Sequence, residues 1–118
     1  MALSSLPIRR DSRGPDDLWD HCRNSLGIAR LLHHEGRPEP LVATACRLAV
    51  ETACRTALEQ VGLEYDGDLD AALRHLHVRR DASTREPSAR TRLLEAEETV
   101  ALVAAWLRRQ DPGRTWGF

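Results

Sequence analysis

A charged stripe of three residues, Arg47, Glu51 and Arg55, recurs every four residues near the middle of the 118-residue sequence. On a helix this spacing places the three side chains on one face, where each pair contributes about 0.2–0.5 kcal/mol. Arginine also binds phosphate and carboxylate groups through paired N–H donors. The stripe is therefore either an ion network beside a crowded core or a site in which Arg47 and Arg55 hold a phosphate or a partner's carboxylate while Glu51 orients them.

A second group of basic side chains follows further along the chain. Its members are Arg74, His75, His77, Arg79 and Arg80. The segment 79–92 adds to this charge, because its five arginines face only two acids. Cations are favourable at the C-terminus of a helix, which would explain the group locally. The alternative is a site for an anion or RNA, although no aromatic side chain here offers a base a stacking platform.

An acidic run lies between these two groups, at Glu64, Asp66, Asp68 and Asp70. It lacks the twelve-residue spacing and the terminal glutamate of a calcium loop. Turn and helix-capping chemistry accounts for it. A second interpretation is that this acidic turn meets the Arg-rich loop of another subunit.

Three cysteines and five histidines lack the paired spacing of a zinc site, and no serine lies in a nucleophile motif. Cys46 and Cys54 lie two helical turns apart, which is too far for a disulfide. The cysteines are typical of small buried hydrophobic residues in a reducing compartment. We predict no catalytic residue, no metal and no cofactor.

Composition is that of a single globular domain, with 42% hydrophobic and 30% charged residues. The formal net charge of -1 gives no general attraction to nucleic acid or to an anionic membrane. All 17 basic residues other than histidine are arginine. No run of 18 uncharged apolar residues and no signal peptide is present, so we expect a cytoplasmic protein without membrane contact.

Helical periodicity and its stop signals organise the chain into a few segments. Apolar spacing predicts helices from 15 to just before Gly36, from about 40 to 61, from 69 to about 78 and from about 88 to 110. We expect a loose arm at 1–14, a helical domain at 15–111 and a tail at 112–118. Trp106 should fill the core or a subunit interface, and Trp116 should pack back on the bundle. The predicted fold is an all-α, up-and-down antiparallel bundle of four, or at most five, helices.

The stretch ACRLAVETACRTALEQVG, followed by DGDLDAALRHL, resembles the HEPN family, named for nucleotide binding in higher eukaryotes and prokaryotes. Members share an Ala-rich helix with a Glu and a basic residue, then a Gly-containing turn and a short D-L-x-x-L helix. The matching residues are Ala49, Glu51, Ala53, Arg55, Ala57, Leu58, Asp68, Leu69 and Leu73. The resemblance covers roughly residues 15–110. It implies a helical bundle, a homodimer, and a role among RNA-cleaving toxins, their inert relatives or partners of nucleotidyltransferases.

Catalytic members of this family carry an R-x(4–6)-H motif near the last helix, and this chain has none. No arginine lies five to seven residues before any histidine, and Arg13 misses His21 by one position. The expected function is a non-catalytic HEPN-like module that homodimerises and binds a nucleotide, an RNA or a protein partner such as a nucleotidyltransferase. The alternative is a divergent toxin-type RNase in which Arg74, His75 or His77 replaces the motif. A purely structural bundle serving a neighbouring gene product is a third possibility.

Overall fold

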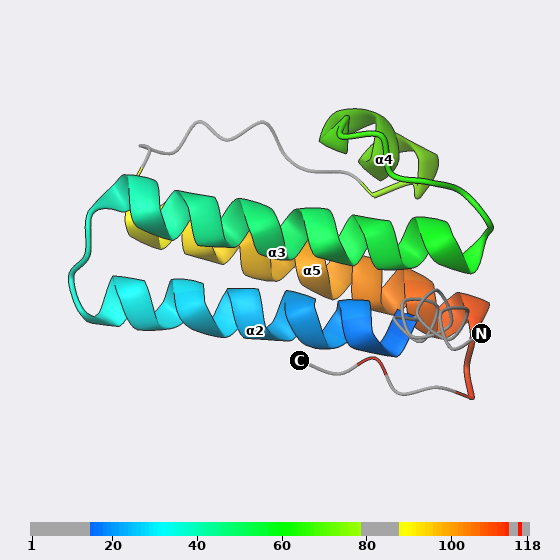
Figure 1. Ribbon diagram of the computed structural model, residues 1–118, viewed down its shortest axis with the longest axis horizontal. Coiled ribbons are helices and arrows are strands. Elements are labelled where there is room, and N and C mark those ends of the chain that lie inside the picture. The colour runs from blue at the N-terminus through cyan, green and yellow to red at the C-terminus, as the bar shows by residue number, and fades with distance from the viewer. Residues whose placement is uncertain (1–14, 79–87, 114–115, 117–118) are drawn as a thin grey trace, which may run out of the picture.

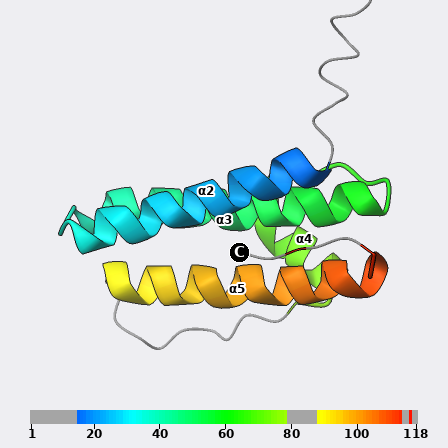
Figure 2. The ribbon, with the colours of Figure 1, turned by 90° about the horizontal axis from the view of Figure 1, so that it is seen from below.

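The computed structural model describes residues 15–78, 88–113 and 116. This part of the chain contains four helices and no strand: α2 (Pro15–His34), α3 (Glu39–Gln60), α4 (Leu69–His75) and α5 (Ala89–Gln110). The long helices α2 and α3 form an antiparallel hairpin, and α5 packs against both of them (Figure 1). Seen from below, α2 and α3 form one layer, and α5 and the short α4 both lie on one side of this layer (Figure 2). The predicted all-α, up-and-down antiparallel bundle is confirmed.

Side-chain caps fix the starts of the two later helices. Ser88 precedes α5, and its hydroxyl oxygen accepts the backbone N–H of Thr91 at 3.1 Å. Asp68 precedes α4, and its carboxylate accepts the backbone N–H of Ala71 at 3.0 Å. Each cap satisfies a backbone donor that has no partner within its own helix. Both starts agree with the positions predicted from the sequence.

The ends of α2, α3 and α4 share one backbone motif. The second residue after each helix end has a positive φ: Gly36 at 72°, Gly62 at 76° and His77 at 57°. In α4 the His77 N–H donates to the Arg74 carbonyl and the Val78 N–H donates to the Leu73 carbonyl. This pair of bonds is the Schellman motif, whose left-handed position favours glycine. At α4 a histidine occupies that position.

Helix α3 is central because it contacts α2, α4 and α5. Its buried positions are mostly small, which lets its neighbours approach closely. The buried hydroxyls of Thr52 and Thr56 donate to backbone carbonyls one turn earlier, at 2.7 and 2.9 Å, so they leave no donor unsatisfied. From α5 the predicted seam fills the core. It consists of Leu93, Ala96, Val100, Val103 and Leu107, all of which are buried.

Two tryptophans close the end of the bundle where α2 begins. Trp116 is buried and lies edge-on to Trp19, with ring centroids 5.7 Å apart and an interplanar angle of 87°. The tail therefore packs back on the bundle at Trp116, as predicted. Trp106 is also buried within this chain, so it belongs to the core. The arm at 1–14, the segment 79–87 and Phe118 lie outside the described residues.

Candidate functional site

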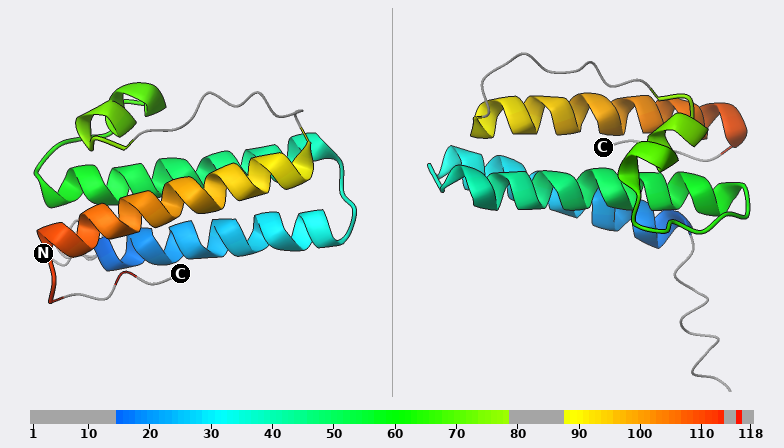
Figure 3. Two further views of the ribbon diagram at one scale, coloured as in Figure 1. Left: turned by 180° about the vertical axis from the view of Figure 1, so that it is seen from behind. Right: turned by 90° about the horizontal axis from the view of Figure 1, so that it is seen from above.

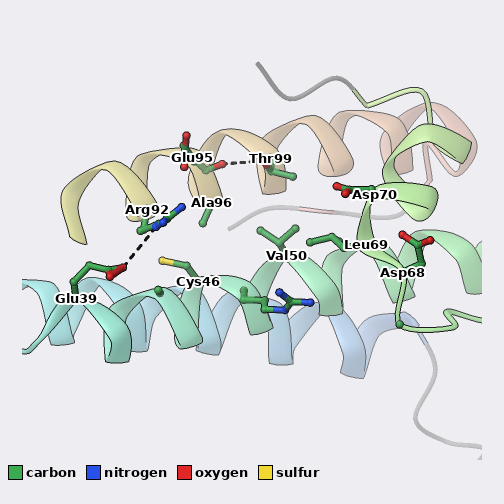
Figure 4. A pocket seen from close by; sticks show the side chains of 13 residues that line it. Glu39, Cys46, Val50, Asp68, Leu69, Asp70, Arg92, Glu95, Ala96 and Thr99 are labelled. Atoms are coloured by element: carbon green, nitrogen blue, oxygen red, sulfur yellow. Dashed lines mark hydrogen bonds and ion pairs between the residues drawn. The ribbon is translucent and has the colours of Figure 1, made fainter. Parts of the chain in front are cut away.

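A cleft of about 770 Å³ opens between α3, the start of α4 and the N-terminal half of α5 (Figure 4). Its apolar lining consists of Ala43 together with four side chains that belong to the core or pack against it, Cys46, Val50, Leu69 and Ala96. Its polar lining consists of Glu39, Arg47, Asp68, Asp70, Arg92, Glu95 and Thr99. Figure 3 shows the three contributing helices from two further sides, with α4 beside the C-terminal half of α3. Apolar and charged side chains in one cleft suit a polar ligand that also has an aliphatic part.

One end of the cleft is closed by an ion pair between helices. Arg92 of α5 points its Nε toward Oε2 of Glu39 in the first turn of α3, at 3.5 Å (Figure 4). The Glu39 oxygen is buried and has no hydrogen bond, so the contact is an ion pair outside hydrogen-bond geometry. Because Arg92 and Glu39 face each other, the pair adds little net charge of either sign to the cleft.

Carboxylates outnumber guanidinium groups around the cleft. The acidic side chains are Glu39, Asp68, Asp70 and Glu95, against Arg47 and Arg92. Arg47 faces Oε2 of Glu51 at 3.6 Å, so both arginines of the lining are paired with carboxylates. This charge balance disfavours a phosphate and favours a cationic group in the cleft.

The predicted stripe on α3 is a cluster built around a fourth residue, Tyr65. The Tyr65 hydroxyl donates to Oε2 of Glu51 at 2.9 Å, the same oxygen that faces Arg47. Arg55 lies over the Tyr65 ring, with its guanidinium carbon 5.7 Å from the centroid, a cation–π contact. Partial burial raises the pKa of Tyr65 to about 12, and the hydrogen bond and negative charge of Glu51 act in the same direction.

Tyr65 was not among the residues predicted from the sequence. It is the only tyrosine in the chain, and it comes three residues after Gly62, where the chain reverses at the end of α3. A residue placed just after such a reversal can reach back onto the last turns of the helix, which is the signal that could have found it. Of the predicted stripe, Arg47 and Glu51 form an ion pair, while Arg55 contacts the Tyr65 ring, so the cluster holds the segment between α3 and α4 against α3.

The second predicted group has a different setting. Arg74 and His75 are exposed in the last turn of α4, and His77 is exposed as the left-handed residue that ends this helix. Arg79 and Arg80 lie outside the described residues. Of the predicted site residues that the structure describes, Arg47 lines the cleft, while Arg74, His75 and His77 are not among its lining residues.

Cys22 and Cys46 are poor nucleophiles. All three cysteines are buried as free thiols, as the sequence predicted. Burial, together with the nearby carboxylate of Glu97, raises the pKa of Cys46, which lines the cleft, to about 11. Burial likewise raises the pKa of Cys22 to about 12. Because the thiolate is the reactive form, neither residue is activated for covalent chemistry near neutral pH.

Within the described residues, His, Cys, Asp and Glu side chains form no group of three or more that could hold a metal ion. None of the four described helices combines the length and apolar character that crossing a membrane requires.

Comparison with known proteins leaves the family open. No protein-family model matches the chain, and neither the curated proteins nor the solved structures contain a match. The HEPN resemblance thus stays a prediction from the residues quoted above, and the site must be interpreted from its own geometry.

Proposed function

We propose that this protein is a non-catalytic, HEPN-like helical module that homodimerises and binds a partner through the cleft between α3, α4 and α5. The sequence left three kinds of partner open: a nucleotide, an RNA or a protein. The charge of the cleft supports a protein partner, because the carboxylates in its lining outnumber its two arginines, which are already paired. A lysine or arginine of that protein would place its aliphatic stem on Val50 and Ala96 and its charge among the carboxylates.

The RNase alternative has less support. It requires histidine and arginine side chains gathered where a scissile phosphate could lie, with the histidine free to exchange a proton. His75 and His77 are instead exposed at the end of α4 and do not belong to the lining of the cleft. In the described residues the cleft has no histidine in its lining.

Size-exclusion chromatography coupled to light scattering tests the assembly, first on the protein alone and then with a pool of RNA and nucleotides. The proposal predicts a dimer that elutes unchanged with the pool. Titration of ¹⁵N-labelled protein with an arginine-containing peptide, with a nucleotide and with a short RNA then tests the cleft. The peptide should shift amide signals around Leu69 and Ala96, and the phosphate-bearing ligands should not.

A matched pair of variants assigns that binding to the cleft. Glu95→Gln removes one carboxylate from its lining, whereas Glu59→Gln removes an exposed carboxylate elsewhere on α3. Peptide affinity should fall about threefold to tenfold in the first variant and stay unchanged in the second. Saturable binding of the nucleotide or the RNA to these same amides would contradict the choice of a protein partner.

A further inference from the structure

The layer formed by α2 and α3 carries four large apolar side chains in contact with solvent. Ile28 and Leu31 of α2 are 53% and 55% exposed, and Leu41 and Leu48 of α3 are 49% and 53% exposed. Each pair is spaced three or seven residues apart, so each lies along one side of its helix. Because α2 and α3 are antiparallel neighbours joined by a short turn, the two pairs belong to the same half of the hairpin.

These side chains face away from α5. On α2 the side chain that reaches α5 is Arg30, whose Nε donates to Glu97 at 2.7 Å. At 100° per residue, Arg30 lies about 160° around the helix from Ile28. On α3, Cys46 lines the cleft toward α5 and lies about 160° from Leu48 by the same rule. We call the side of the α2–α3 layer opposite α5 the outer face. Figure 2 shows the layer from its edge, with α4 and α5 together on the side opposite the outer face.

The middle of the outer face is free of charge. Between Arg23 and Glu35 the only charged residue of α2 is Arg30, which is directed to α5. Between Glu39 and Glu51 the only charged residue of α3 is Arg47, which is directed to Glu51 and the cleft. Depletion of charge at the centre of a surface distinguishes the core of a protein interface from ordinary surface.

The size and symmetry of the outer face suit a second copy of the chain. Two helices of 20 and 22 residues, about 30 Å long and about 10 Å apart, present roughly 600 Å² before their side chains are counted. This approaches the roughly 800 Å² that each partner buries in a typical stable complex. A flat pair of antiparallel helices can pair with its own copy about a two-fold axis, which buries the same residues on both protomers.

Charges at both ends of the outer face are compatible with that symmetry. The end at the α2–α3 turn carries Glu35 and Arg37. The other end carries Asp17, Asp20 and Arg23 on α2, where Arg23 is paired with Asp20, and Arg55 and Glu59 on α3. Each end therefore carries charges of both signs. A two-fold pairing that brings opposite ends together brings no block of like charge into contact.

We propose that the outer face, centred on Ile28, Leu31, Leu41 and Leu48, is the surface through which two copies of this chain associate. The proposal rests on the homodimer of the proposed function and deepens it, because it names the residues that meet. It places the cleft on the far side of α3 from the dimer contact, so a dimer displays two accessible clefts.

The experiment compares two variants with a matched control by light scattering across a concentration series. Leu48→Glu and Ile28→Glu each place a charge at the centre of the outer face, one on each helix. Leu102→Glu introduces the same charge at a leucine of α5 that is 46% exposed. The dissociation constant should rise at least about thirtyfold in the first two variants and stay unchanged in the third. Far-ultraviolet circular dichroism checks that every variant keeps its helices.

Each outcome decides the proposal. Loss of the dimer in Leu48→Glu and Ile28→Glu, with the dimer kept in Leu102→Glu, supports it. A dimer that persists in both outer-face variants, or that only Leu102→Glu disrupts, overturns the assignment of this face and leaves the homodimer in place. A wild-type chain that stays monomeric at high concentration overturns both the homodimer and the assignment of this face. Should Leu48→Glu unfold, Ile28→Glu still decides.

Discussion

Glu51→Gln should lower the pKa of Tyr65. In the wild type the phenol hydroxyl donates to Oε2 of Glu51 at 2.9 Å, and losing its proton would place two negative charges side by side. Partial burial, the hydrogen bond and the charge of Glu51 together raise the pKa from its ordinary value of 10.0 to about 12. The amide keeps the shape and an acceptor oxygen but removes the charge. The midpoint should therefore fall toward 10 without reaching it, because the burial remains.

The sign of the effect on stability follows from linkage. Below pH 10 the phenol is protonated in both the folded and the unfolded chain, so its full contribution to folding is present. Between about pH 10 and pH 12 the unfolded chain loses this proton first, and stability falls. A difference of two pKa units corresponds to about 2.7 kcal/mol. Because Tyr65 is only partly buried, solvent screening reduces this figure to about 1–2 kcal/mol.

The assay is direct because Tyr65 is the only tyrosine in the chain. Its ionisation can be followed by the tyrosinate absorbance band, with circular dichroism at each pH to confirm that the helices persist. Arg47→Gln should move the midpoint in the opposite direction to Glu51→Gln, since the positive charge of Arg47 lowers the pKa of the phenol. Glu59→Gln, an exposed change on the same helix, should leave it in place. A wild-type midpoint near 10, or one that Glu51→Gln does not move, would refute the cluster as described.

Three further predictions concern the free energy of unfolding, measured by urea titration. His77→Gly should stabilise the protein by up to about 1 kcal/mol, because φ is 57° there and glycine adopts this conformation without strain; any loss of stability would contradict the Schellman assignment. Ser88→Ala should cost about 1 kcal/mol by removing the cap of α5, and Ser88→Asp should restore most of it. Leu107→Ala should cost about 2–5 kcal/mol because the side chain is fully buried, whereas Leu102→Ala at an exposed site of the same helix should cost under about 1 kcal/mol.

The helices were predictable because their boundaries depend on local chemistry. Asp68 and Ser88 each accept the backbone N–H of the residue three positions later, which starts a helix. Gly36 and Gly62 adopt the left-handed conformation that ends the preceding helix. Such signals need no knowledge of the rest of the fold. The end of α4 was misleading. There His77 occupies the left-handed position that glycine occupies after α2 and α3. As a histidine it suggested a site residue, but its observed role is to end the helix.

The cleft could not be predicted from spacing alone. Its walls come from α3, from the start of α4 and from α5, which are separated in sequence and meet only through packing. The ion pair of Glu39 with Arg92 joins the first turns of two helices, and no periodicity within either helix indicates it. The spacing of Arg47, Glu51 and Arg55 along one face of α3 was predictable. The contact of Arg55 with Tyr65 was not, because Tyr65 lies beyond the end of α3 and packs back onto it.

The crowding of α3 explains why both proposed surfaces include this helix. Its circumference is occupied by α2, α5 and α4, and the remaining arc carries Leu41 and Leu48 toward the outer face. The edge of that arc beside α4 carries Arg47 and Glu51 instead, and Arg47 reaches the cleft. Helix α3 therefore separates the proposed dimer contact from the proposed partner site, and its closely packed, buried alanines oppose any shift of the helix. The two contacts should accordingly be independent, so a Leu48→Glu monomer should bind the arginine-containing peptide with wild-type affinity per cleft.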